Sequence, residues 1–272
     1  MNEKKRLDLI LVERGLARSR EEAKSLIKSG GVTVNGAPQT RPGADVPEES
    51  DICVTAERIP YVSRGGLKLE KALQTFRPDL TDKITMDIGA STGGFTDCML
   101  QSGARKVYAV DVGTGQLAES LVNDPRVVNL EQTNIRALQP EQVEPIDFFS
   151  TDVSFISLTL VLPQAYRLLK DGGEGICLIK PQFEVGKGRV GKKGVVKDPK
   201  LHEEVLQTVP RMAAALGFAV LGLDFSPIRG PEGNIEYLMY LRKQEVGAVC
   251  WRGNAAELVR KAHRTLKASE ER

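Results

Sequence analysis

The sequence lacks any long uninterrupted run of apolar residues, although 41% of its 272 residues are hydrophobic. The longest candidate, residues 153–163, is shorter than the roughly 18 apolar residues that mark a membrane-spanning helix, and it directly follows Asp152. The N-terminus, Met-Asn-Glu-Lys-Lys-Arg, is charged and has no apolar stretch behind it, so we expect no secretory signal. These absences argue against a membrane-spanning or secreted protein.

Cysteine is also scarce, and the four that occur lie far apart, at Cys53, Cys98, Cys177 and Cys250. No Cys-x-x-Cys pair is present, which argues against a zinc site and against a disulfide framework. We therefore expect reduced thiols, a cytoplasmic location and no bound metal. Because the net charge is only +2, a polyanionic partner would have to be recognised by a local basic patch.

Residues 5–57 have the pattern of a small α+β unit with two helices. Ser19-Arg20-Glu21-Glu22 is a capping box that predicts the start of the second helix. Short strands are predicted at 32–34 and 52–54, and Asn35-Gly36 predicts a hairpin turn after the first of them.

The run from Arg6 to Gly36, followed by residues 46–54, closely resembles the S4 RNA-binding domain. The resemblance implies that the second helix and the following turn contact RNA, and cations at one-turn spacing on that helix can track phosphates. The residues implied in RNA binding are Arg6, Arg18, Arg20, Lys24 and Lys28. A second basic cluster, in the glycine-rich stretch 186–197, adds the candidates Lys187, Arg189, Lys192 and Lys193.

From residue 80 onward, apolar runs alternate with amphipathic stretches, which predicts a parallel, doubly wound sheet with helices on both faces. The expected strands are 84–88, 106–110, 127–130, 146–150 and 175–179, and the expected helices are 157–169, 200–216 and 254–270. Two further strands, 218–225 and 235–241, have no helix between them, which predicts a hairpin and an antiparallel last strand. Ser63 is a candidate cap for a helix that bridges the two halves.

A glycine-rich loop, Asp87-Ile-Gly-Ala-Ser-Thr-Gly-Gly-Phe95, follows the first predicted strand. Its glycines allow a tight turn and a close approach to a ligand. The loop is neither Gly-x-Gly-x-x-Gly nor a Walker loop, which argues against a nicotinamide oxidoreductase. The second strand ends at Asp111, where a carboxylate can accept hydrogen bonds from two ribose hydroxyls.

This pattern resembles the S-adenosylmethionine site of Rossmann-like methyltransferases. The resemblance implies that the loop borders the methionine part of the cofactor, that Asp111 holds the ribose and that Asn134 contacts adenine. The implied cofactor residues are Asp87, Gly89, Ser91, Gly93, Gly94, Phe95, Asp111, Asn134 and Asp152.

Two charged residues stand just past buried strands, Asp152 after the fourth and Lys180 after the fifth. Glu236 stands in an apolar strand, where a carboxylate is costly unless it is paired. With Lys68 on the bridging helix, these residues resemble the catalytic Lys–Asp–Lys–Glu set of FtsJ-type ribose 2′-O-methyltransferases.

Together with the S4 pattern and the segments SRGGLKL, DIGASTGGFTD and TDVSFISL, the resemblance extends along nearly the whole chain to the TlyA family. That family is often labelled haemolysin, and the resemblance implies methylation of a cytidine 2′-hydroxyl in ribosomal RNA, with ribosomal RNA or ribosomal subunits as partners. Such an enzyme must align donor and acceptor and assist loss of the hydroxyl proton. Lys180 takes that proton if burial and Lys68 lower its pKa, or it stabilises the alkoxide if it stays charged.

The expected fold class is α/β: a Rossmann-like class I methyltransferase with a seven-stranded, mostly parallel sheet, plus a small α+β S4 domain at the N-terminus. The expected domains are 1–58 (S4), 59–80 (linker and bridging helix), 81–245 (methyltransferase) and 246–272 (C-terminal helical extension). Two alternatives stay open at this point: an RNA-binding assembly factor without catalysis, and a membrane-damaging haemolysin.

Overall fold

The computed structural model describes residues 4–17, 19–28, 30–55, 59–186, 188–191 and 194–268, with the backbone alone at Glu21 and Ser25. The chain forms two compact units, Met1–Pro60 and Tyr61–Arg272. The helix expected to bridge the halves therefore belongs to the second unit.

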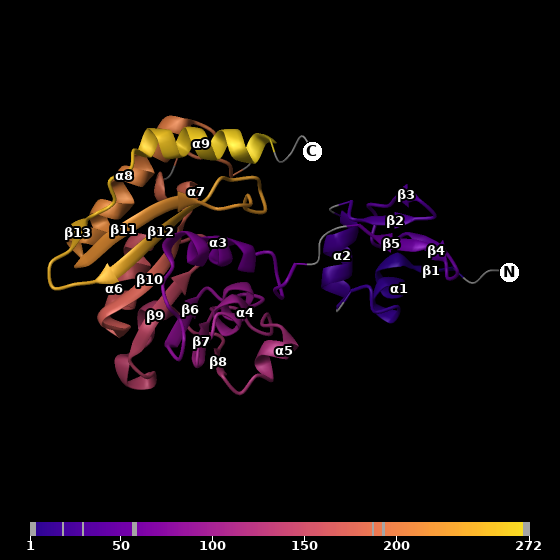
Figure 1. The fold of residues 1–272 in the computed structure, drawn as a ribbon, viewed down its shortest axis with the longest axis horizontal. Coiled ribbons are helices and arrows are strands. Elements are labelled where there is room, and N and C mark those ends of the chain that lie inside the picture. Colours follow the sequence, from indigo (N-terminus) through magenta and orange to yellow (C-terminus); the bar gives the residue numbers. More distant parts are fainter. Residues whose placement is uncertain are drawn as a thin grey trace. The chain divides into compact units, whose positions relative to one another are not determined.

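The first unit packs two helices against short strands (Figure 1). The helices are α1 (Leu7–Glu13) and α2 (Arg20–Lys28), and the strands are β1 (Lys4–Arg6), β2 (Val32–Val34), β3 (Ala37–Pro38), β4 (Asp45–Pro47) and β5 (Ile52–Val54). The predicted cap is confirmed, because the amide of Glu22 donates to Ser19 Oγ at 3.2 Å. The hairpin is confirmed too: Asn35 and Gly36 have φ of 50° and 78°, and Val34 pairs with Ala37.

One pairing in the first unit was not predicted from the sequence. β1 pairs antiparallel with β4, so that Arg6 lies opposite Asp45. The segment Lys-Lys-Arg has no alternation of apolar and polar residues, which is the pattern that reveals a half-buried strand. The core of this unit comes instead from side chains such as Leu7, Leu11 and Ile27, all buried.

The second unit is built on one eight-stranded sheet, ordered β13-β11-β12-β10-β9-β6-β7-β8. The strands are β6 (Ile84–Ile88), β7 (Lys106–Val110), β8 (Val127–Leu130), β9 (Ile146–Thr151), β10 (Leu169–Ile179), β11 (Phe218–Phe225), β12 (Tyr237–Lys243) and β13 (Ala248–Val249). The five strands from β10 to β8 run parallel, and β12 is antiparallel to both neighbours, which confirms the predicted closing hairpin.

Three details of the predicted sheet were wrong. The fifth strand, expected at 175–179, begins at Leu169, where it pairs with Ile146 before a register shift. The sheet has eight strands rather than seven, because the two-residue β13 pairs with β11 at the edge. The last long strand begins at Tyr237 rather than at residue 235, so Glu236 stands directly before it.

Helices cover both faces of this sheet (Figure 1). The α-helices are α3 (Gly66–Phe76), α4 (Gly94–Gln101), α5 (Glu119–Val122), α6 (Leu158–Leu168), α7 (Pro181–Glu184), α8 (Pro199–Ala215) and α9 (Ala255–Ala268), and two 3₁₀ turns are η1 (Ile135–Ala137) and η2 (Pro140–Gln142). Side chains of α6, α8 and α9 share one core with the sheet. None of the helices in the described part of the chain has both the length and the apolar character required to cross a bilayer.

The opposite face of the sheet carries α3 and α4. Met86 and Ile88 of β6 belong to the core formed with α6 and α8, while Asp87 between them accepts a hydrogen bond from Thr96 of α4 at 2.8 Å. Successive side chains of β6 therefore point to opposite faces of the sheet, and both faces are buried, as in other parallel sheets. The prediction that Ser63 caps α3 was wrong, because the helix begins at Gly66 and Gly65 occupies the cap position without a side-chain hydrogen bond.

The tightest packing in the centre of the sheet is at Gly175. A Cβ at this position of β10 would lie 2.2 Å from the ring of Phe149 on β9. We expect Gly175→Ala to lower the free energy of unfolding by about 1–3 kcal/mol, because overpacking forces neighbouring side chains away from their preferred rotamers. Urea unfolding of the full chain measures this, and an unchanged midpoint would show that Phe149 moves aside at no cost.

Candidate active site

The glycine loop turns between β6 and α4 in a backbone conformation that few residues adopt. Gly89 and Gly93 have φ of 88° and 94°, and Ser91 between them has φ of 48°. A Cβ at Gly89 would lie 3.0 Å from the carbonyl oxygen of Asp152. Glycine is therefore required where the loop passes the end of β9.

Asp111 fixes the shape of this loop. Its Oδ2 accepts from the amide of Ser91 at 2.8 Å, and its Oδ1 accepts from the amide of Gly113 at 2.7 Å. A carboxylate has about four lone-pair sites, so each oxygen can accept one further hydrogen bond. Asn134 is exposed, and its Oδ1 caps η1 by accepting from the amide of Arg136.

Asp87 lies under the loop rather than on its surface. Its side chain is 1% exposed and accepts hydrogen bonds from Thr96 at 2.8 Å and from Ser150 at 3.4 Å. Burial raises the pKa of this carboxyl to about 7. In this position Asp87 supports the start of α4 and is shielded from a ligand in front of the loop.

The four predicted charges meet in one row, Lys180–Asp152–Lys68–Glu236. Lys180 Nζ lies 2.6 Å from Asp152 Oδ1, and Lys68 Nζ lies 3.1 Å from Asp152 Oδ2 and 2.7 Å from Glu236 Oε2. The side chains of Lys68 and Glu236 are 7% and 1% exposed. Each charge has an opposite charge beside it, which is the arrangement that a largely buried set requires.

The electrostatics of the row follow from burial and from this order. Burial disfavours a charged Lys68, but the carboxylates of Asp152 and Glu236 outweigh burial and raise its pKa. Burial likewise disfavours charge on Asp152, and the two lysines outweigh it and lower the pKa of that carboxyl. At Glu236, which has one lysine contact, burial prevails and the pKa is raised.

Three residues of the row, Lys68, Asp152 and Lys180, share one cavity of about 230 Å³ with the glycine loop, and Glu236 is not among its lining residues. It is lined by Ser63, Gly65, Lys68, Gly89, Ala90, Ser91, Thr92, Gly94, Phe95, Asp152, Ser154, Lys180 and Pro231. Lys71, the other lysine of this part of α3, lies elsewhere and donates to the carbonyl oxygen of Phe225 at 2.6 Å. A ligand at the loop would therefore lie beside Lys180 and Asp152.

Two residues near Asp152 were missed at the level of sequence, Ser154, which lines the cavity, and Phe155. Ser154 is exposed, and its Oγ accepts a hydrogen bond from Lys180 Nζ at 3.0 Å. Phe155 is 92% exposed, has a φ of 64° and lies 5.3 Å from the ring of Phe183. They stand two and three residues after Asp152, and an aromatic residue so soon after a strand end was the available signal.

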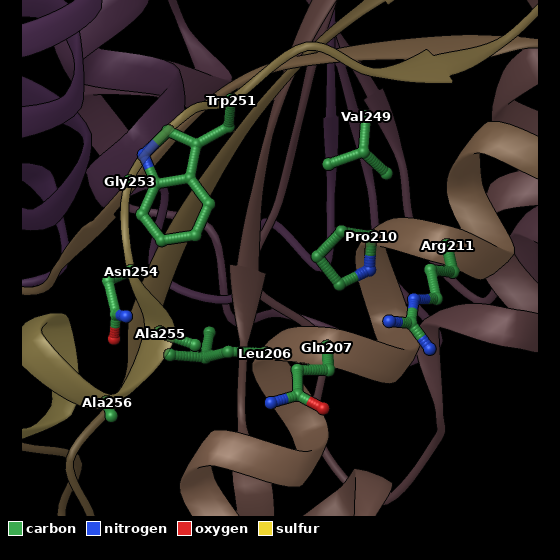
Figure 2. Close-up of a pocket in the computed structure, with 10 residues that line it drawn as sticks. All are labelled: Leu206, Gln207, Pro210, Arg211, Val249, Trp251, Gly253, Asn254, Ala255 and Ala256. Atoms are coloured by element: carbon green, nitrogen blue, oxygen red, sulfur yellow. The ribbon is translucent and has the colours of Figure 1, made fainter.

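A larger cavity, of about 560 Å³, lies between α8 and the start of α9 (Figure 2). Figure 2 shows Trp251 and Pro210 on its walls, with Arg211 at one side. Arg211 is the one charged side chain among the residues that line it, and none of those residues is acidic. This cavity lacks the paired charges that mark the first one.

The predicted RNA-binding residues have different surroundings. Arg20 and Lys28 on α2 are exposed, as is Arg6, whereas Lys24 is half-buried. Arg189 forms a two-pronged ion pair with Glu204 of α8, at 2.6 and 2.5 Å. The remaining candidates lie outside the described residues: Arg18, Lys187, Lys192 and Lys193.

Comparison with known proteins gives matches over both units. Residues 61–243 match the model of the FtsJ-like methyltransferases, and residues 5–52 match that of the S4 domain. A protein of Mycobacterium tuberculosis, named 16S/23S rRNA (cytidine-2′-O)-methyltransferase TlyA, is 46% identical over 93% of this chain and 95% of its own length.

Two solved structures extend these matches. A Streptococcus thermophilus protein with a hemolysin name is 46% identical, and each chain covers 100% of the other with a TM-score of 0.82. An S-adenosylmethionine-dependent methyltransferase from Listeria monocytogenes is 16% identical, covers 66% of this chain and 99% of its own, and has a TM-score of 0.52. The second likeness establishes a shared fold.

The central position of Lys68 leads to a stability prediction. We expect Lys68→Met to lower the free energy of unfolding by about 3–5 kcal/mol near neutral pH, because it leaves two buried carboxylates short of a counter-charge. Lys180→Met should cost less, since Asp152 keeps Lys68. The loss at Lys68 should shrink as the pH falls, because protonation removes the uncompensated charges.

Denaturant unfolding between about pH 5 and pH 8 measures both effects. Lys71→Met is the matched control. Lys71 lies on the same helix as Lys68 and is more exposed, and it pairs with Asp224 of β11 at 3.2 Å. Equal losses of unfolding free energy for Lys68→Met and Lys71→Met would contradict the central role of Lys68. A loss for Lys68→Met that does not depend on pH would contradict it too.

Proposed function

Since the chain belongs to the FtsJ-like methyltransferase family, it is an enzyme that uses S-adenosylmethionine, and we propose that its acceptor is a cytidine 2′-hydroxyl of ribosomal RNA. The observation that carries the proposal is the cavity in which the glycine loop meets Lys68, Asp152 and Lys180, with Glu236 paired to Lys68 outside its lining. The S4 match supports an RNA substrate, and the printed name of the Mycobacterium tuberculosis relative supports cytidine.

The residues around the loop fit the methyl donor. Gly89 and Gly93 let the loop pack closely against Asp152 and Leu121, and Asp111 retains free lone pairs beside the loop for ribose hydroxyls. Asn134, which follows β8, uses its Oδ1 as a cap and keeps its amide nitrogen for an adenine ring. When bound, the donor supplies a methyl group already activated for displacement by its positively charged sulfur.

The charged row supplies what the acceptor needs. A ribose hydroxyl is a weak nucleophile near neutral pH, so the enzyme must align it and stabilise the negative charge that develops on its oxygen. Lys180 Nζ is the atom that we assign to this oxygen, because it ends the row and faces the loop across the cavity. Lys68 holds Asp152 and Glu236 in place and lies one step further from the acceptor.

Features of both units support RNA as the molecule that carries the hydroxyl. The exposed cations Arg6, Arg20 and Lys28 suit a phosphate backbone, and the exposed ring of Phe155 beside the cavity suits an unstacked base.

The four cysteines are free, as expected for a reducing cytoplasm where ribosomes are found. A purely binding role leaves the buried row unexplained, and no observation on the described residues favours membrane damage over this chemistry.

Replacement of Lys180 tests the assignment of the acceptor. Lys180→Ala should lower the rate of methyl transfer at least about 100-fold, because its interaction matters mainly in the transition state. Affinities for S-adenosylmethionine and for ribosomal subunits should stay within about threefold. Lys180→Arg should also fail, since a planar guanidinium does not reproduce a compact ammonium.

Single-turnover assays with radiolabelled methyl donor and purified small or large ribosomal subunits measure this rate. Lys170→Ala, at the opposite end of β10 and paired with Asp147, is the matched control and should keep full activity. A Lys180→Ala enzyme within about threefold of the wild type, or under roughly 0.7 kcal/mol, would exclude the assignment.

Asp111 tests the assignment of the glycine loop to the cofactor. Asp111→Ala should weaken S-adenosylmethionine binding by about 1–3 kcal/mol, because it removes hydrogen bonds to the ligand and frees the amides of Ser91 and Gly113. Calorimetry measures the affinity, with Asp124→Ala as a control that breaks only a surface pair with Arg126. Unchanged affinity in a folded Asp111 variant would place the ribose elsewhere.

A further inference from the structure

The first unit contains a buried acid that no part of the methyl-transfer chemistry uses. Asp8, at the start of α1, has a side chain that is 0% exposed. Arg6 donates to it from two nitrogens, Nε to Oδ1 at 3.0 Å and Nη2 to Oδ2 at 2.9 Å. Arg20, from the first turn of α2, donates to the same Oδ2 at 3.4 Å. One carboxylate thus joins two arginines from different elements.

The two arginines differ from Asp8 in exposure. Their side chains are 47% and 50% exposed, so the carboxylate lies beneath and much of each arginine faces solvent. The Arg6 guanidinium lies next to Gly43, where a Cβ would be 3.5 Å from two of its nitrogens. The amide of Asp8 donates to the carbonyl oxygen of Pro42 at 3.1 Å, which fixes the acid to the same segment.

We propose that Asp8 is a positioning residue for RNA binding, which holds the guanidinium groups of Arg6 and Arg20 side by side as a preformed phosphate-binding pair. The proposal rests on the proposed function, since it states how the first unit, which matches the S4 domain, binds RNA. Two guanidinium groups repel each other, and the shared carboxylate offsets that repulsion in the free protein. Each guanidinium has five N–H donors, of which Arg6 uses two and Arg20 one on Asp8.

The hydrogen bonds from Arg6 also outweigh the burial of Asp8 and lower the pKa of its carboxyl. The acid therefore stays ionised at neutral pH and keeps both arginines in place. Long arginine side chains lose conformational freedom when they bind, and preorganisation removes part of that cost. The proposal has a distinctive consequence, which is that an acidic side chain strengthens the binding of a polyanion. Charge alone predicts that the same acid weakens this binding.

The direction of this effect is the test. Asp8→Asn removes one negative charge, yet we expect it to weaken binding of fluorescently labelled ribosomal subunits about 3- to 10-fold in the full chain. Asp45→Asn is the matched control, because Asp45 lies opposite Arg6 in β1–β4 and no hydrogen bond to Arg6 is seen within the described residues. This variant removes the same charge and should bind as tightly as the wild type or more tightly.

A double-mutant cycle separates positioning from general support of the fold. In the background Arg6→Ala with Arg20→Ala, the further change Asp8→Asn should alter RNA affinity less than twofold, since the side chains it positions are gone. Arg6→Lys with Arg20→Lys should also bind more weakly than the wild type despite an unchanged charge, because the forked contacts are lost. This charge-neutral variant provides the test if Asp8→Asn does not fold, as judged by thermal melting.

Three results would overturn the proposal. One is an Asp8→Asn protein that binds RNA as tightly as Asp45→Asn, another is the same loss in the arginine-free background, and the third is full affinity of the double lysine variant. Failure of the proposed function is distinguishable, because it would appear as absence of methyl transfer to ribosomal RNA by the wild-type enzyme. S-adenosylmethionine affinity should be the same in every one of these variants.

Discussion

The double neutralisation of Asp152 is the interaction on which the second unit depends. Each oxygen of this carboxylate faces a different lysine, and one of them also neutralises Glu236. The four residues come from the end of β9, the end of β10, helix α3 and the residue before β12. Because loss of Lys68 would leave Glu236 without a counter-charge and loss of Asp152 would do the same to Lys180, these four elements must meet for the buried charges to be paired.

The same constraint couples the charged row to the glycine loop. The amide of Asp152 donates to the carbonyl oxygen of Ile88, the last residue of β6, and a Cβ at Gly89 would lie 3.0 Å from the carbonyl oxygen of Asp152. Backbone contacts of this kind are stiffer than contacts between long side chains. The sheet consequently fixes the distance between a methyl donor at the loop and an acceptor hydroxyl at the row. Small errors in that distance lower the rate of group transfer.

Sequence patterns predicted much of this fold and part of the site. The first three strands of the sheet were predicted to the residue, because continuous apolar runs end sharply at polar residues such as Asp111. Lys68, Asp152, Lys180 and Glu236 were found from strand ends and from resemblance, but the central position of Lys68 depends on how α3 packs, which no local pattern encodes. Asp87 was placed among the cofactor residues by resemblance, and its side chain lies buried beneath the loop, where it accepts from Thr96. The strand pair β1–β4 and the edge strand β13 are too short to show any period.

The two units also differ in how much apolar surface they bury. The first has a core of ten buried apolar side chains among its described residues, at the size where a single hydrophobic core gives only marginal stability. A ligand that binds only the folded form of such a unit shifts its folding equilibrium, by about 2.7 kcal/mol at a concentration 100 times the Kd. An RNA recognised by this unit would therefore also act as its stabiliser, and the unit would resist unfolding and proteolysis best while it is engaged with its substrate.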